Sequence, residues 1–299
     1  MSNVFIISAM VPSWQRFVLL GLLAVSLILW TGWLIKVLIS RRLLRGFAQI
    51  QDRPQLAEVA LAAISLVLLA SLWAWLLRGI VGSQNLELAL AGALAELLTC
   101  LLILGLLAWQ DPNRLSCFGL APRGLSRHLG WGLITALAVW PLATYLLLPV
   151  SLWTVKFLSR WVWHLAYTPQ PHTLLREMTQ TTLAINFWLV VGLAVIIAPL
   201  TEEILFRGLL QGALARLFRS RWFAIAISAA IFSIFHLTVR QTVPAGEVSL
   251  ANVETVLPLF LLGLALGYSY EKSGSLYRPM VIHLTFNALS LIMVWPQLP

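Results

Sequence analysis

The chain has 299 residues, of which 60% are hydrophobic and only 10% are charged. A soluble domain of this length needs far more charge to cover its surface, so the composition excludes a soluble globular protein and predicts a membrane protein. The formal net charge of +9 does not indicate a nucleic-acid partner, because the basic residues lie between apolar runs, as topology signals do.

Apolar runs of about 20 residues predict membrane-spanning helices. We therefore expect an all-α fold, a polytopic transmembrane helical bundle of about eight spanning helices. The runs lie at 17–39, 57–77, 88–109, 129–150, 184–206, 222–238, 255–270 and 280–296. We expect two regions, an N-terminal three-helix membrane region over 1–128 and a catalytic core over 129–299.

Basic residues gather in every second connector, and this alternation follows the positive-inside tendency. It predicts that both termini lie outside. The connector 152–183, which would then also lie outside, nevertheless holds Lys156, Arg160 and Arg176. Two interpretations of its aromatic residues stay open, a helix in the headgroup layer and an aromatic belt that anchors the neighbouring spans. These residues are Trp153, Phe157, Trp161 and Trp163.

Glu96 lies near the middle of the third predicted span. A carboxylate at that depth must be paired, protonated or exposed to water. A structural hydrogen bond to a neighbouring helix is the favoured interpretation, and a part in a functional site is the alternative.

The stretch 198–210 places Glu202, Glu203 and Arg207 on an apolar helix. Residues four apart share a helical face, so Glu203 and Arg207 are expected to form an ion pair. Glu202 points about 100° away from Glu203, stays unpaired in an apolar setting, and is a candidate general base for water. Pro199 is expected to kink the helix and open room beside the carboxylates.

Glu202 and His236 lie at nearly equal distances before and after the connector 219–221. Two antiparallel helices that turn there would bring both side chains to a similar depth. We therefore expect the carboxylate and the imidazole to share an activated water. Phe232 lies one turn before His236 and is expected to form a wall of this site.

His283 and Asn287 are again four residues apart on one helix, and both can donate a hydrogen bond to a developing oxyanion. Any one of these polar residues, taken alone, favours a structural hydrogen bond between helices. Several of them together on apolar helices indicate a functional site. His283 follows the connector 271–279 closely. It therefore meets the other residues only if that connector dips into the protein or if the seventh helix does not cross fully.

Three segments resemble the EExxxR, FxxxH and HxxxN/D motifs of the CPBP (Abi) family: Glu-Glu-Ile-Leu-Phe-Arg at 202–207, Phe-Ser-Ile-Phe-His at 232–236 and His-Leu-Thr-Phe-Asn at 283–287. That family includes type II CAAX prenyl proteases and bacteriocin-processing or bacteriocin-immunity proteins. The resemblance covers residues 184–291 and implies an intramembrane endopeptidase. The catalytic residues it implies are Glu202, His236, His283 and Asn287, with Glu203, Arg207 and Phe232 in support.

A metal ion is the open question of this site. Glu202, His236 and His283 could bind zinc with an open fourth position. However, the HExxH pattern is absent, and no carboxylate is placed by spacing to orient either histidine. We therefore expect water activation without a metal or other cofactor, with zinc on these three residues as the alternative.

The favoured function is a membrane-embedded endopeptidase of a bacterial-type plasma membrane. Its partner would be a peptide or membrane-protein substrate, lipidated or not. The alternative is a non-catalytic immunity or scaffold protein that binds peptides or partner proteins. A transporter would use the same buried charges as an ion pathway, but the sequence shows no inverted repeat.

Overall fold

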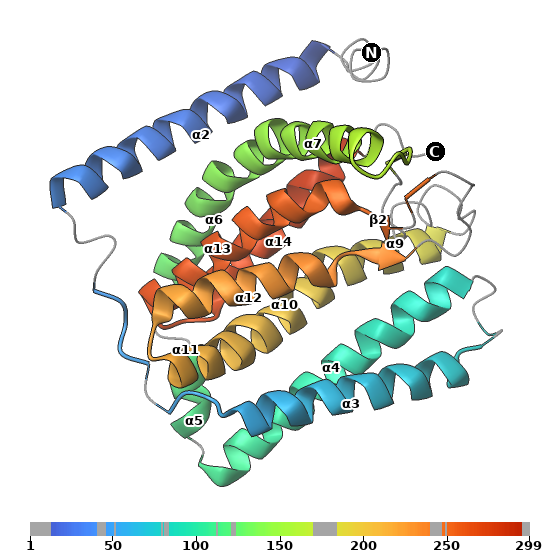
Figure 1. Ribbon diagram of the computed structural model, residues 1–299. Coiled ribbons are helices and arrows are strands. Elements are labelled where there is room, and N and C mark those ends of the chain that lie inside the picture. Colours follow the sequence, from blue (N-terminus) through green and yellow to red (C-terminus); the bar gives the residue numbers. More distant parts are fainter. Residues whose placement is uncertain are drawn as a thin grey trace.

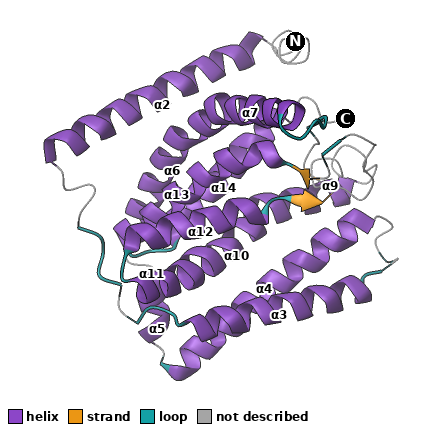
Figure 2. Cartoon of the chain, viewed as in Figure 1, coloured by secondary structure: helices purple, strands orange, loops and turns teal. Residues whose placement is uncertain are grey.

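Nearly all of the described chain is helical, and the long helices lie alongside one another (Figure 1). The computed structural model describes residues 13–40, 46–50, 52–78, 80, 84–111, 113–120, 124–169, 184–239, 247–248 and 250–294. Within these ranges the strands are β1 (Thr238–Val239) and β2 (Leu250–Ala251), a short antiparallel pair (Figure 2). The predicted all-α helical bundle is confirmed.

Two pieces of the N-terminal region flank the bundle on different sides. Helix α2 (Ser13–Ser40) packs against α6 (Leu125–Pro141), whereas α3 (Leu56–Leu76) and α4 (Gln84–Gln110) form a hairpin against the helices that follow residue 184 (Figure 1). Both pieces thus contact residues beyond 128. The division of the chain into 1–128 and 129–299 stays a prediction.

The predicted span 129–150 is part of a longer helix. Helix α6 continues without a break through η3 (Leu142–Leu147) and α7 (Leu148–Trp161), a stretch of 37 residues. At 1.5 Å per residue it is roughly 55 Å long, far beyond a hydrocarbon core of roughly 30 Å. Its end, α7, bends away from α6 (Figure 1) and carries the exposed, stacked rings of Trp153 and Phe157. The aromatic segment therefore continues a predicted span as one helix, and both interpretations of its aromatic residues stay open.

The predicted motifs lie on the last helices of the chain. The first is a single stretch built of α9 (Ala184–Gly192), η4 (Leu193–Ile197), α10 (Ala198–Glu202), η5 (Glu203–Gln211) and α11 (Gly212–Phe218). It ends at Arg219, whose φ of 52° is left-handed, and Ser220 then caps α12 (Arg221–Phe235) by accepting a hydrogen bond from the Phe223 N–H. Helix α12 returns alongside this stretch, as the predicted hairpin requires. The chain continues through η6 (Val253–Thr255) to α13 (Val256–Ser273) and α14 (Tyr277–Val294).

Five helical stretches within the described ranges are long and apolar enough to cross a bilayer. They are Leu56–Leu76, Leu86–Gln110, Leu125–Trp161, Phe187–Phe218 and Val253–Ser273. Helices α2, α12 and α14 occupy the other three predicted spans, and the apolar parts of α2 and α12 are shorter, Leu20–Trp33 and Arg221–Phe235. The protein is an integral membrane protein, while the count of about eight spans stays a prediction.

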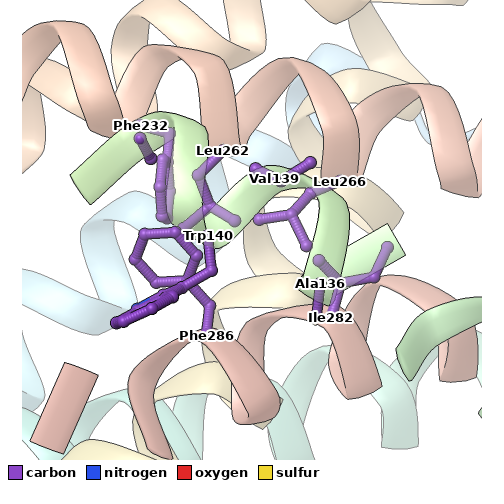
Figure 3. Close-up of a cluster of buried hydrophobic side chains, with 9 residues drawn as sticks. Ala136, Val139, Trp140, Phe232, Leu262, Leu266, Ile282 and Phe286 are labelled. Carbon is purple, nitrogen blue, oxygen red and sulfur yellow. The ribbon is translucent and has the colours of Figure 1, made fainter. Parts of the chain in front are cut away.

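The main apolar core lies between α6, α12, α13 and α14. Its labelled side chains in Figure 3 are Ala136, Val139, Trp140, Phe232, Leu262, Leu266, Ile282 and Phe286. Trp140 Nε1 donates to Ser290 Oγ at 2.8 Å, so the polar atom of the indole is satisfied. Gly263 allows α13 to approach α12 closely, because a Cβ there would lie 2.9 Å from the Ala229 Cα.

A distorted turn in the α6–α7 stretch fixes the position of α2. The Leu142 N–H bonds to the Val139 carbonyl, three residues back, so the Ala138 carbonyl loses its usual helical donor. Ser26 Oγ and Trp30 Nε1 of α2 both donate to this carbonyl, at 2.7 and 2.9 Å. A free carbonyl is costly in lipid, so these bonds give α2 a specific docking point.

The connector between α13 and α14 is buried, as the meeting of the motifs requires. Ser275 and Leu276 are 5% and 0% exposed, and Leu276 N–H donates to the Gly119 carbonyl at 2.9 Å. Gly119 belongs to η2 (Ser116–Leu120) and has a φ of 92°, where a Cβ would meet the connector backbone at 3.0 Å. The depth of this connector brings His283 to the level of Glu203.

A buried ion cluster closes the opposite end of the bundle from the β1–β2 pair. Glu271 is fully buried and accepts two hydrogen bonds from Arg53, at 2.9 and 2.8 Å. Gln211 Nε2 donates to the same carboxylate at 3.2 Å, and Arg221 Nε lies 3.8 Å from it. Arg53 is thereby fixed against the ends of α12 and α13.

Glu271→Ala is expected to lower the free energy of unfolding by about 3–5 kcal/mol, because it leaves the Arg53 charge without its buried partner. The measurement is reversible unfolding in mixed micelles, followed by tryptophan fluorescence. Arg160→Ala, a change at an exposed position, is the control and should alter stability by less than about 0.5 kcal/mol. Equal stability of the two variants would contradict the structural role given to Glu271.

Candidate active site

Pro199 distorts the helix that carries Glu202. The residues before it form the π-helical segment η4, in which the Ala198 N–H bonds to the Leu193 carbonyl, five residues back. In this register the Ala194 carbonyl would need a donor from Pro199, which has no N–H. Asn287 Nδ2 of α14 donates to it instead, at 2.8 Å. The structure thus has a π-distortion before Pro199 that is satisfied by a neighbouring helix, while the predicted kink and the room beside the carboxylates stay predictions.

Glu203 and Arg207 form the predicted ion pair. Arg207 Nη1 donates to Glu203 Oε1 at 3.0 Å, and both side chains have no exposed surface. The guanidinium also lies 4.4 Å from the centre of the Phe232 ring on α12. A carboxylate, a hydrogen bond and an aromatic face together compensate for burying this cation.

His283 lies between the two adjacent carboxylates. Its Nδ1 is 2.8 Å from Glu203 Oε1, and its Nε2 is 3.8 Å from Glu202 Oε2. The sequence indicated no carboxylate that would orient a histidine, and this expectation is wrong, since Glu203 does so. The contact joins residues 80 positions apart, and helical spacing carries no signal for it.

His236 caps the C-terminal end of α12. Its Nδ1 lies 2.9 Å from the Phe232 carbonyl oxygen, the geometry expected of an N–H donor, which leaves Nε2 as an acceptor. The Phe232 ring contacts both imidazoles edge to face, with centroids 4.7 Å from that of His236 and 5.7 Å from that of His283. Phe232 thus stands between the two histidines, in agreement with the wall that was expected.

The site residues differ in their access to solvent. Glu203 and Arg207 are fully enclosed and the His283 side chain is 4% exposed, whereas the Glu202 side chain is 17% exposed. Glu202 Oε2 is buried, and among the described residues none donates a hydrogen bond to it. Glu203 Oε2 also lacks a partner among the described residues, so the two carboxylates differ in that Glu203 is held through Oε1 by Arg207 and His283, whereas Glu202 is partly exposed and has no such short contact. A vacant carboxylate oxygen beside an imidazole can accept a proton.

Asn287 makes a structural contact in addition to any chemical one. One N–H of its amide is engaged with Ala194, and the amide carries a second N–H.

Glu96 of α4 makes the interhelical hydrogen bond that was favoured for it: it accepts from Thr201 Oγ1 at 2.8 Å. Thr201 directly precedes Glu202, so the alternative that Glu96 serves the site stays open.

The described residues include no group of three or more His, Cys, Asp or Glu side chains placed to hold a metal ion. His283 Nδ1 and His236 Nδ1 are each turned to a protein oxygen. The three zinc ligands considered from the sequence are therefore not gathered around one point in this arrangement.

Fold and site together define a polytopic membrane protein with a carboxylate–histidine centre enclosed by apolar helices. Residues 184–289 match the family described as type II CAAX prenyl endopeptidase Rce1-like, a protease family. The resemblance inferred from the three motifs is thereby confirmed.

The chain is also similar to a curated protein of Escherichia coli described as an uncharacterized 24.3 kDa protein. The two are 31% identical over 102 residues, which is 32% of this chain and 40% of the E. coli protein. The chain thus spans less than half the length of that relative. No solved structure matches the chain.

Glu203→Ala and Arg207→Ala are each expected to lower the free energy of unfolding by about 3–5 kcal/mol, because each leaves the partner charge buried alone. Glu202→Gln should cost much less, since Glu202 is partly exposed and lacks a short ion pair. The free energy of unfolding of all three variants is measured in mixed micelles. A loss for Glu202→Gln as large as that for Glu203→Ala would contradict the different roles of the two carboxylates.

Proposed function

We propose that the protein is an intramembrane endopeptidase in which Glu202 activates water for attack on a peptide bond. The observation that carries the proposal is the arrangement of Glu202 and His283. The Glu202 oxygen is vacant and lies 3.8 Å from an imidazole whose other nitrogen is held by a buried ion pair. The protease family that matches residues 184–289 supports the same reaction class.

In the proposed reaction Glu202 removes a proton from water while the new oxygen–carbon bond forms at the scissile carbonyl. His236 Nε2, free to accept a hydrogen bond, helps to orient this water. The tetrahedral intermediate then collapses, the carbon–nitrogen bond breaks, and the proton held by Glu202 passes to the leaving amine. The water is thereby divided between the two products, a carboxylic acid and an amine.

The negative charge that develops on the carbonyl oxygen needs donors. We assign this role to the second N–H of Asn287 and to His283 Nε2 once the imidazole has taken up a second proton, because Nδ1–H is already directed at Glu203. Glu203 and Arg207 support His283: the Glu203 carboxylate receives the Nδ1–H, which sets the tautomer and the direction of the ring. Asn287 also keeps α14 in register with the helix that carries Glu202, through its bond to Ala194.

We further propose that water is activated without a metal ion. The support is that Glu202 lies beside His283 and can take the proton directly, and that the described residues include no group of three or more His, Cys, Asp or Glu side chains placed to hold a metal ion. Zinc on Glu202, His236 and His283 is the competing arrangement, and it would require these side chains to converge on one point.

The proposed substrate is a peptide or a membrane protein, lipidated or not, cleaved within or near the bilayer. The apolar helices around the site and the family match support a substrate of this kind. A CAAX-type or bacteriocin-type peptide is the specific class within this proposal. We also propose a bacterial-type plasma membrane as its location, supported by the E. coli relative.

Glu202→Gln and His236→Ala are expected to abolish cleavage, because one removes the base and the other the group that orients the water. Peptides from membranes of cells carrying wild-type protein are compared with those from cells carrying each variant, by mass spectrometry. Equal membrane insertion and an unchanged melting profile are the controls. If Glu202→Gln protein keeps the biological activity and the same membrane peptides, the non-catalytic alternative replaces this proposal.

Chelators are expected to leave the cleavage rate of purified protein unchanged, because the proposed base acts without a metal. The measurement pairs the rate before and after treatment with 1,10-phenanthroline with the metal content of the same sample. Stoichiometric zinc, together with activity that is lost to the chelator and restored by zinc, would overturn the metal-free mechanism.

A further inference from the structure

Two side chains of α4 contact Thr201, the residue that directly precedes Glu202. Glu96 Oε2 lies 2.8 Å from Thr201 Oγ1, and Cys100 Sγ lies 3.6 Å from the Thr201 carbonyl oxygen. Thr201 and Cys100 are each 2% exposed, so the Cys100 contact is enclosed by protein, while the Glu96 contact is partly buried. Helix α4 lies outside residues 184–289. The catalytic helix is thus held by a part of the chain that the family match does not include.

The Thr201 hydroxyl has one hydrogen and three acceptors within reach. The Glu96 carboxylate is the nearest, at 2.8 Å, and the carbonyls of Ile197 and Ala198 each lie at 3.1 Å. A threonine inside a helix ordinarily donates back to the preceding turn of its own helix. Glu96 competes with that bond, so it controls the direction of the hydroxyl and ties Thr201 to α4.

This contact lies between a proline and a change of helical register. Pro199 supplies no N–H, and the π-helical segment η5 begins at Glu203. Thr201 lies between them. Its side-chain contact with Glu96 therefore adds a constraint on this turn from a neighbouring helix. A carboxylate at membrane depth is costly, and a simple bond between two helices does not require one.

We propose that Glu96 is a positioning residue of the catalytic site: through Thr201 it fixes the turn that presents Glu202, which makes the α3–α4 hairpin part of the working enzyme. This inference rests on the proposed function of Glu202. Glu96 acts through Thr201, without touching the substrate. A displacement of a catalytic group by about 1 Å costs about 10²-fold in rate, which sets the effect to be measured.

The test uses the full-length protein in lipid nanodiscs and a synthetic peptide that spans the cleavage site found in the membrane-peptide comparison. Glu96→Ala and Thr201→Val should each lower kcat by about 10²-fold and leave KM unchanged, because the substrate contacts stay in place. Glu96→Gln should retain most of the wild-type kcat, because the amide oxygen still accepts from the Thr201 hydroxyl. Thr99→Val is the matched control: Thr99 is buried on the same helix, and its hydroxyl has no hydrogen-bond partner among the described residues.

A second measurement does not depend on turnover. Hydrogen exchange of the amides at 203–206 should be faster in Glu96→Ala and Thr201→Val than in wild-type protein, and unchanged in Thr99→Val. Wild-type kcat in Glu96→Ala, or an equal loss in Thr99→Val, overturns the proposal. If the wild-type protein cleaves nothing, the proposed function fails instead. In that case the hydrogen exchange of the amides at 203–206 is the remaining test of whether Glu96 orders this turn. An unchanged exchange rate in Glu96→Ala overturns the positioning role.

Discussion

The structure depends on the burial of one ion pair, Glu203 with Arg207. The two side chains meet at 3.0 Å without exposed surface, in an interior where a lone charge would be prohibitively costly. Each further partner of the pair comes from a different helix: His283 of α14 bonds to the carboxylate, and Phe232 of α12 covers the guanidinium. The same pair therefore joins the three helices that carry the motifs. Stability and the assembly of the site rest on one set of contacts.

A second constraint comes from helices that do not complete their own hydrogen bonds. In lipid a free carbonyl must find a donor within the protein. The Ala194 carbonyl, left free by Pro199, receives the Asn287 amide, and the Ala138 carbonyl receives Ser26 and Trp30. Each distortion thus selects a particular neighbouring helix and a particular register. The proline and the π-helical segments specify the arrangement of the bundle as much as its apolar surfaces do.

The sequence predicts what depends on local spacing. The Glu203–Arg207 pair, the different direction of Glu202 and the hairpin that returns to His236 all follow from helical geometry, and the structure has each of them. The contact of His283 with Glu203 could not be predicted, because it depends on how deeply the α13–α14 connector lies beneath Gly119. The partner of Glu96 was likewise undetermined, because the contact with Thr201 depends on how α4 packs against another helix. The unbroken helix from Leu125 to Trp161 was missed because hydropathy marks where a span leaves the bilayer, not where the helix ends.

Two neighbouring glutamates with the same chemistry have different surroundings, which supports the different roles proposed for them. About 100° of rotation separates neighbouring residues of a helix, and here Glu203 is buried against Arg207 while Glu202 is partly exposed and without a short ion pair. Because Glu203 receives the Nδ1–H of His283, the other ring nitrogen is turned toward Glu202. In the proposed mechanism, a proton taken up by Glu202 lies beside an imidazole whose orientation is fixed by Glu203. In the proposed mechanism the buried Glu203 fixes the ring of His283, and that ring lies beside the partly exposed Glu202.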